Sequence, residues 1–67
     1  MTTIKILELV GVSDKSWHDA VDNAVAEANQ TVRNITGLDV INTTAKIKDG
    51  AIVEYHANVK IAFRVGA

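Results

Sequence analysis

The C-terminal part of the chain alternates strictly between apolar and polar residues. From Ala51 to Val65 every odd position is apolar, and most even positions carry a polar or charged side chain. A period of two predicts a β-strand with one face on a core and the other in a polar setting. At roughly 3.3 Å per residue this strand would approach 50 Å, far longer than a usual strand. The odd positions include Val53, Tyr55, Ala57, Val59, Ile61 and Phe63, and the polar even positions are Glu54, His56, Asn58, Lys60 and Arg64.

Two more strands are predicted upstream. Thr2–Val10 has a β-rich, roughly alternating pattern that ends at Gly11, and Leu38–Ile47 is rich in valine, isoleucine and threonine. Both patterns are typical of strands bounded by turn residues. Residues 48–50, Lys-Asp-Gly, predict a hairpin turn of the three-residue type, in which Gly50 can adopt a positive φ angle.

A helix is predicted between the first two strands, from about Ser16 to Asn34. Ser16 and Asp19 have the spacing of a capping box, in which each side chain bonds the other residue's backbone N–H. Apolar residues then recur every three or four positions, and at 1.5 Å per residue the helix would be roughly 28 Å long. Gly37 is expected to end it as a left-handed residue. The apolar stripe consists of Trp17, Ala20, Val21, Ala24, Val25, Ala28, Val32 and Ile35.

This element order predicts one α+β domain spanning residues 1–67, a β-α-β-β unit whose three-stranded antiparallel sheet wraps around one helix. One helix covers one face of a sheet, so the polar face of Ala51–Val65 must meet solvent, another subunit or the inside of an assembly. A chain of 67 residues without cysteine and with two histidines has neither disulfides nor a zinc site to support so small a core. Symmetric self-association is the expected support, because it would also cover the sheet edges.

Charge and hydropathy restrict the partners. Seven lysines and arginines against eight acidic residues give a net charge of −1, without a basic block for nucleic acid. Lys5 and Glu8 interrupt the first apolar stretch, which therefore does not resemble a signal peptide, and no apolar run is long enough to span a membrane. We expect a soluble cytoplasmic protein with no nucleic-acid or membrane partner.

No catalytic motif stands out, and we expect no catalytic residue and no enzyme activity. Ser13, His18 and Asp22 could be drawn as a triad, but they lie on or beside one helix and are better explained as capping and surface residues. The acidic residues Asp19, Asp22 and Glu27 lack the spacing of a calcium-binding loop. Metal ligands therefore cannot be named from the sequence.

Trp17 and His56 are the two ring side chains whose roles the sequence pattern addresses. Trp17 opens the apolar stripe and is expected to anchor the core or an interface. His56 lies between Glu54 and Asn58 on the polar face, either as an ordinary paired histidine or as a ligand contact.

The stretch Asn34–Val40 admits three interpretations. Asn34 begins one of three N-x-T sequons, with Asn29 and Asn42, but without a secretory signal these are chance matches. Gly37 is expected to stop the helix. The same glycine would also leave open space in which a ligand could lie.

Several stretches together resemble the dodecin family. They are Lys5–Ser13, the pair Ser16-Trp17 that opens the alanine-rich helix, Thr31–Asn34, Glu54-Tyr55 and Val59–Arg64. The resemblance covers essentially the whole chain with the same element order. It implies that twelve protomers form a hollow homododecamer, and that the protein binds a small ligand and is not an enzyme. The precedent in the family is storage of FMN, riboflavin or FAD, bound in pairs between subunits.

The resemblance also identifies three ligand-binding positions, and all three depart from the flavin-binding pattern. Gly37 occupies the position of the tryptophan that stacks on the flavin ring. Thr44 replaces a frequent arginine, and His56, after Tyr55, replaces the glutamine that hydrogen-bonds the ring edge. Loss of a stacking ring forfeits on the order of 1–3 kcal/mol, which argues against tight flavin binding.

Relatives without this tryptophan exist, and some are associated with calcium. The alternative expectation is therefore a calcium-type ion-binding shell or a purely structural one.

Overall fold

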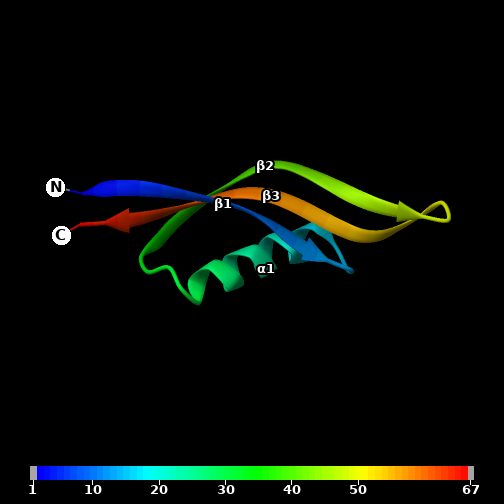
Figure 1. Ribbon diagram of the computed structural model, residues 1–67, viewed down its shortest axis with the longest axis horizontal. Coiled ribbons are helices and arrows are strands. Elements are labelled where there is room, and N and C mark those ends of the chain that lie inside the picture. Colours follow the sequence, from blue (N-terminus) through cyan, green and yellow to red (C-terminus); the bar gives the residue numbers. More distant parts are fainter. Residues whose placement is uncertain (1, 67) are drawn as a thin grey trace.

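The protein folds as a β-α-β-β unit in the computed structural model, which describes residues 2–66 (Figure 1). Its elements are β1 (Thr3–Ser13), α1 (Trp17–Asn29), β2 (Ile35–Lys48) and β3 (Ala51–Val65). The sheet has the order β1-β3-β2, and β3 pairs antiparallel with both neighbours. The predicted fold class and the bounds of the last strand are confirmed.

The central strand determines which residues share a face. Directly opposed residues of an antiparallel pair point to the same side, so each even position of β3 shares a face with its partners on β1 and β2. The odd positions Ala57, Val59 and Ile61 are buried beneath α1. We call their side the helix face and the opposite side the helix-free face.

A small core of alanines joins the helix to the sheet. Ala20, Ala24 and Ala28 recur every fourth residue on α1 and pack on the three buried odd positions of β3. Because an alanine side chain is a single methyl group, the helix lies close to the strands. These six residues are the buried hydrophobic side chains within residues 2–66.

The protomer is long and thin. It measures 52 × 20 × 13 Å, and its radius of gyration of 13.8 Å exceeds the roughly 11 Å typical of a compact chain of this length. Its accessible surface of 4752 Å² is also above the roughly 4100 Å² expected for 7.2 kDa. The helix does not reach the tip of the β2–β3 hairpin (Figure 1), so much of the sheet is uncovered within one protomer.

The start of α1 follows the predicted cap only in part. Ser16 Oγ accepts a hydrogen bond from Asp19 N–H at 2.9 Å, as predicted. The Asp19 carboxylate, however, accepts from the hydroxyl of buried Ser13 at 2.7 Å. Ser13 Oγ in turn accepts from the backbone N–H of Lys15 and Ser16, so the capping network extends back into the end of β1.

The end of α1 differs from the prediction. The helix stops at Asn29, and the N–H groups of Thr31 and Val32 both bond the carbonyl of Ala28. The left-handed residue is Asn34, with φ of 64°, because asparagine tolerates this conformation better than most residues. Gly37 has no positive φ and lies inside β2, so its predicted role as the helix stop is wrong.

Two further boundaries also differ. β1 continues through Gly11 to Ser13, because Gly11 pairs with Ala57 without a bulge. The β2–β3 turn contains two residues and not three, since Lys48 pairs directly with Ala51. Asp49 and Gly50 both have positive φ, 53° and 77°, as a type I′ hairpin turn requires.

Gly11 permits the close contact between helix and sheet. A Cβ atom at this position would lie 1.9 Å from the Ala20 carbonyl oxygen and 2.9 Å from the Ala24 methyl group. We therefore predict that Gly11→Ala lowers the free energy of unfolding by at least about 1–3 kcal/mol, since the helix must move away. Urea denaturation at fixed protein concentration measures this change.

Gly37→Ala is the matched control, because nothing lies within 4 Å of its added Cβ. It should change the free energy of unfolding by no more than about 0.5 kcal/mol. Equal effects of the two substitutions would contradict the assigned role of Gly11.

Candidate functional site

The three positions implied by the family resemblance lie on one face but at two places. Thr44 on β2 and His56 on β3 are directly opposed on the helix-free face. Gly37 is opposed to Ala62 on the same face, six residues from His56 along β3. At about 3.3 Å per residue this separation is roughly 20 Å. One protomer therefore brings Thr44 and His56 together and leaves Gly37 apart.

His56 is held by a carboxylate on its own strand. Its Nε2 lies 2.6 Å from Oε1 of Glu54, two residues earlier on the same face. The two side chains are 33% and 40% exposed, so the pair is accessible without being fully solvated. Val12 on β1 is the other neighbour of His56, opposite Thr44. The imidazole thus stands between an apolar and a hydroxyl-bearing side chain.

An amide pair occupies the adjacent position of the same face. The side-chain amide of Asn58 donates to the side-chain oxygen of Asn42 across β3 and β2. Asn58 is opposed on β1 by Val10, which is 52% exposed. The alternation in the sequence placed Asn58 on the polar face, but only the strand register identifies Asn42 as its partner.

The helix-free face is amphipathic across its width. Its β1 side carries exposed aliphatic residues, whereas its β3 and β2 sides carry amide, imidazole, hydroxyl and charged groups. In its middle, Lys60 lies between two acidic residues, Glu8 and Asp39, on the neighbouring strands. Such a face suits a ligand or protein surface that is apolar in part and has hydrogen-bonding groups at one edge. The exposed aliphatic residues of β1 on this face are Ile4, Ile6, Val10 and Val12.

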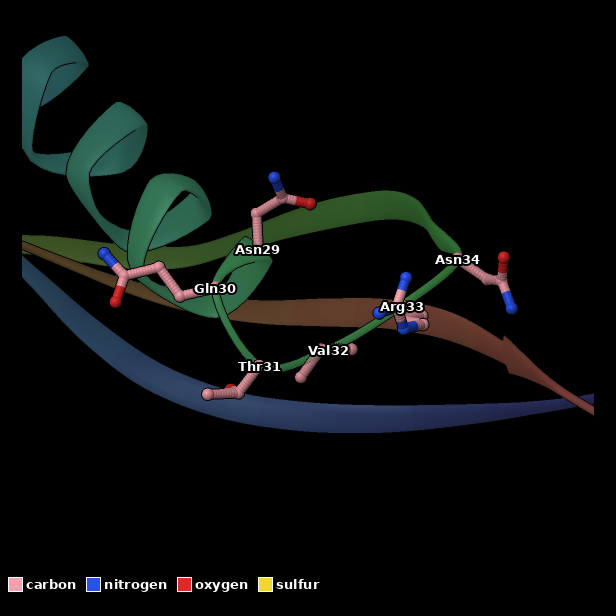
Figure 2. A pocket seen from close by; sticks show the side chains of 6 residues that line it. All are labelled: Asn29, Gln30, Thr31, Val32, Arg33 and Asn34. Atoms are coloured by element: carbon pink, nitrogen blue, oxygen red, sulfur yellow. The ribbon is translucent and has the colours of Figure 1, made fainter.

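Gly37 leaves open space at the other end of this face. No atom lies within 4 Å of a Cβ built there, so the backbone could present a larger side chain without a clash. The preceding loop surrounds a depression of about 410 Å³ lined by residues 29–34 (Figure 2). Its lining is mainly polar, from the amide side chains of Asn29, Gln30 and Asn34 to the guanidinium of Arg33.

Trp17 connects the helix to the backbone beside His56. Its indole Nε1–H donates to the carbonyl oxygen of Thr44 at 2.8 Å, and its ring meets the edge of Tyr55 with centroids 4.8 Å apart. The side chain is nevertheless 39% exposed. Trp17 thus links the start of α1 to β2 and β3 but lies outside the buried core, and its role as an interface anchor stays a prediction.

The residues of the hypothetical triad form two separate pairs. Ser13 is buried and bonded to Asp19, whereas His18 lies 3.4 Å from Asp22 on the exposed surface of α1. Within residues 2–66 no three histidine, cysteine, aspartate or glutamate side chains cluster as metal ligands would. Over the same residues no helix has both the length and the hydropathy needed to cross a bilayer.

Comparison with known proteins relates this geometry to one family. The sequence profile described as Dodecin matches residues 3–66. A dodecin from Thermus thermophilus is 30% identical over 61 residues, which cover 91% of this chain and 88% of that protein. A calcium dodecin from Mycobacterium tuberculosis is 25% identical over 65 residues, covering 97% of this chain and 92% of the relative.

Solved structures agree with the fold. Dodecin from Streptomyces coelicolor superposes with a TM-score of 0.94 at 32% identity, over 98% of this chain and 94% of that chain. The M. tuberculosis protein, described as calcium chelating with a novel calcium-binding site, superposes with a TM-score of 0.83 at 26% identity, over 96% and 91%. The profile match over nearly the whole chain and the shared β-α-β-β fold show that this protein belongs to the dodecin family.

Proposed function

We propose that the protein forms a homododecamer that binds and stores a small planar ligand between its subunits. One observation carries this proposal: the helix-free face has an accessible Thr44–His56 pair and an open position at Gly37, roughly 20 Å apart in one protomer. A ligand smaller than this separation can contact both only where copies of the chain meet. The face would then line a shared site.

The exposed apolar surface supports assembly. Leu38 and Val40 are opposed to Ile61 and Val59, which α1 buries, yet they are 42% and 43% exposed, because α1 packs mainly on β1 and β3. At the hairpin end, Ile47 is 59% exposed. A small domain with so many uncovered aliphatic side chains gains stability by burying them against other subunits. Twelve copies follow the family's precedent.

A flavin is the proposed ligand class, by family precedent, and Gly37, Thr44 and His56 are its proposed contacts. The aliphatic side of the helix-free face suits an aromatic ring, and the imidazole suits its polar edge. Binding should be weak, because Gly37 provides no stacking surface. The proposed role is storage without catalysis, in the cytoplasm, which is compatible with a cysteine-free chain.

The assembly is tested by light scattering of the purified chain. Twelve copies of 7.2 kDa should give a particle of about 86 kDa. A stable folded monomer near 7.2 kDa would contradict the proposed assembly and the shared site.

The ligand site is tested by giving Gly37 a stacking ring. Gly37→Trp combined with His56→Gln should tighten FMN or riboflavin binding by roughly 5- to 150-fold, since one stacked ring contributes on the order of 1–3 kcal/mol. Quenching of flavin fluorescence measures the affinity. Gly37→Ala is the control and should leave it within about twofold. An unchanged affinity of the double variant would refute the assignment of Gly37 to the site.

Calcium binding is the second candidate, and the similarity to the M. tuberculosis calcium dodecin favours it. Calcium takes six to eight oxygen ligands, but residues 2–66 of one protomer hold no cluster of three acidic or histidine side chains. Its ligands would therefore have to come from several subunits or include carbonyl and amide oxygens.

Calorimetric titration with calcium, together with thermal melting with and without chelator, tests this candidate. A structural ion would release or absorb heat on binding and raise the melting temperature, because ligands of the folded state stabilise it. No heat and an unchanged melting temperature at millimolar calcium would exclude the calcium-binding shell.

A further inference from the structure

We propose that His18 and Asp22 on α1 form a binding site for a zinc ion, with Nε2 of the imidazole and Oδ2 of the carboxylate as its two protein ligands. The site lies on the opposite side of the protomer from Thr44 and His56 and does not depend on the proposed function. Its remaining coordination positions are open to water or to a donor from another molecule, since zinc accepts such ligands beside those of the protein.

The spacing of the two ligand atoms suits tetrahedral zinc. Nε2 of His18 and Oδ2 of Asp22 are 3.4 Å apart. With metal–ligand bonds of roughly 2.0–2.2 Å, two ligands of one tetrahedral ion lie about 3.3–3.6 Å apart. Ligands at right angles, as in octahedral or square-planar coordination, would be only about 2.8–3.1 Å apart. A zinc ion therefore fits between the two atoms without a change in their separation.

The helix holds the two side chains next to each other. They are four residues apart, and residues at this spacing are neighbours on a helix surface. At about 100° per residue, the pair lies roughly 140° around α1 from the buried alanines, Ala20, Ala24 and Ala28. The pair therefore points away from the sheet, and no strand lies on that side of α1 (Figure 1).

Both groups are available to a metal ion. Their side chains are 88% and 63% exposed, and 3.4 Å is longer than the usual N–H···O hydrogen bond of about 2.9–3.0 Å. Within residues 2–66 neither His18 nor Asp22 takes part in another ion pair or side-chain hydrogen bond. The other imidazole–carboxylate pair, Glu54 and His56, is less suitable, because a metal ion would first have to break its 2.6 Å hydrogen bond.

The chemistry of the pair selects the ion. An imidazole nitrogen and a carboxylate oxygen are both common zinc ligands. Calcium is bound by oxygen ligands, so the imidazole of His18 cannot contribute to a calcium site. Zinc binding at this pair and the calcium binding considered above are therefore separate properties, and each can fail without the other.

Calorimetric titration of the full chain with zinc chloride tests the site. One ion should bind per chain, and His18→Ala or Asp22→Asn should each weaken binding about tenfold or more, because each removes one of only two protein ligands. Glu27→Gln, which changes another exposed carboxylate of α1, and His56→Gln are the controls and should leave the affinity within about twofold. Circular dichroism should show the same helix content in His18→Ala and Asp22→Asn as in the unmodified chain.

NMR of the ¹⁵N-labelled chain locates the ion. Zinc should shift the ring nitrogens of His18 and leave those of His56 in place, and excess calcium should not reverse the shift. Zinc binding that persists unchanged in either His18→Ala or Asp22→Asn would overturn the assignment. So would a shift confined to His56, or the absence of saturable binding up to about 1 mM zinc.

Discussion

A helix of 13 residues, about 20 Å long, has to cover a sheet in a protomer that extends over 52 Å. The exposed apolar surface of the protomer follows from this mismatch. The helix packs on the sheet where Gly11 and three alanines let α1 approach β1 and β3 closely. Six hydrophobic residues are buried there. Beyond the helix the strands keep their apolar side chains but have nothing within the protomer to cover them. The fold is therefore a short core with long uncovered extensions, and the proposed assembly would supply the missing burial.

The same mismatch explains why a ligand site would be shared between subunits. Strands long enough to extend beyond the helix also separate Gly37 from His56, although both belong to the helix-free face. A single thin sheet has no interior in which a ligand could be enclosed. What one protomer provides is a patterned surface, aliphatic along β1 and hydrogen-bonding along β3 and β2. The Glu54–His56 contact adds a partly exposed polar pair to this surface, and neighbouring copies would close the proposed site.

Elements with a strong local signal were predicted correctly from the sequence. The alternation of Ala51–Val65 identified β3 and its two faces. Ser16 was also predicted correctly as the N-cap residue of the helix. The helix end was misplaced because Val32 and Ile35 continue the apolar spacing; Ile35 still packs against the core, but from β2. Asn34 provides the left-handed turn that was assigned to Gly37. The Glu54–His56 pair could have been expected from its spacing, whereas the Asn42–Asn58 pair depends on a register shifted by a bulge.

We propose that the folded state of the protomer depends on burial between copies. The most direct measurement follows secondary structure by circular dichroism and molecular size by sedimentation while the protein is unfolded in urea at several concentrations. If folding and assembly are coupled, the two signals should change together, and the midpoint should rise with protein concentration because association stabilises by mass action. A concentration-independent midpoint, with a folded monomer persisting after dissociation, would contradict this dependence on burial between copies.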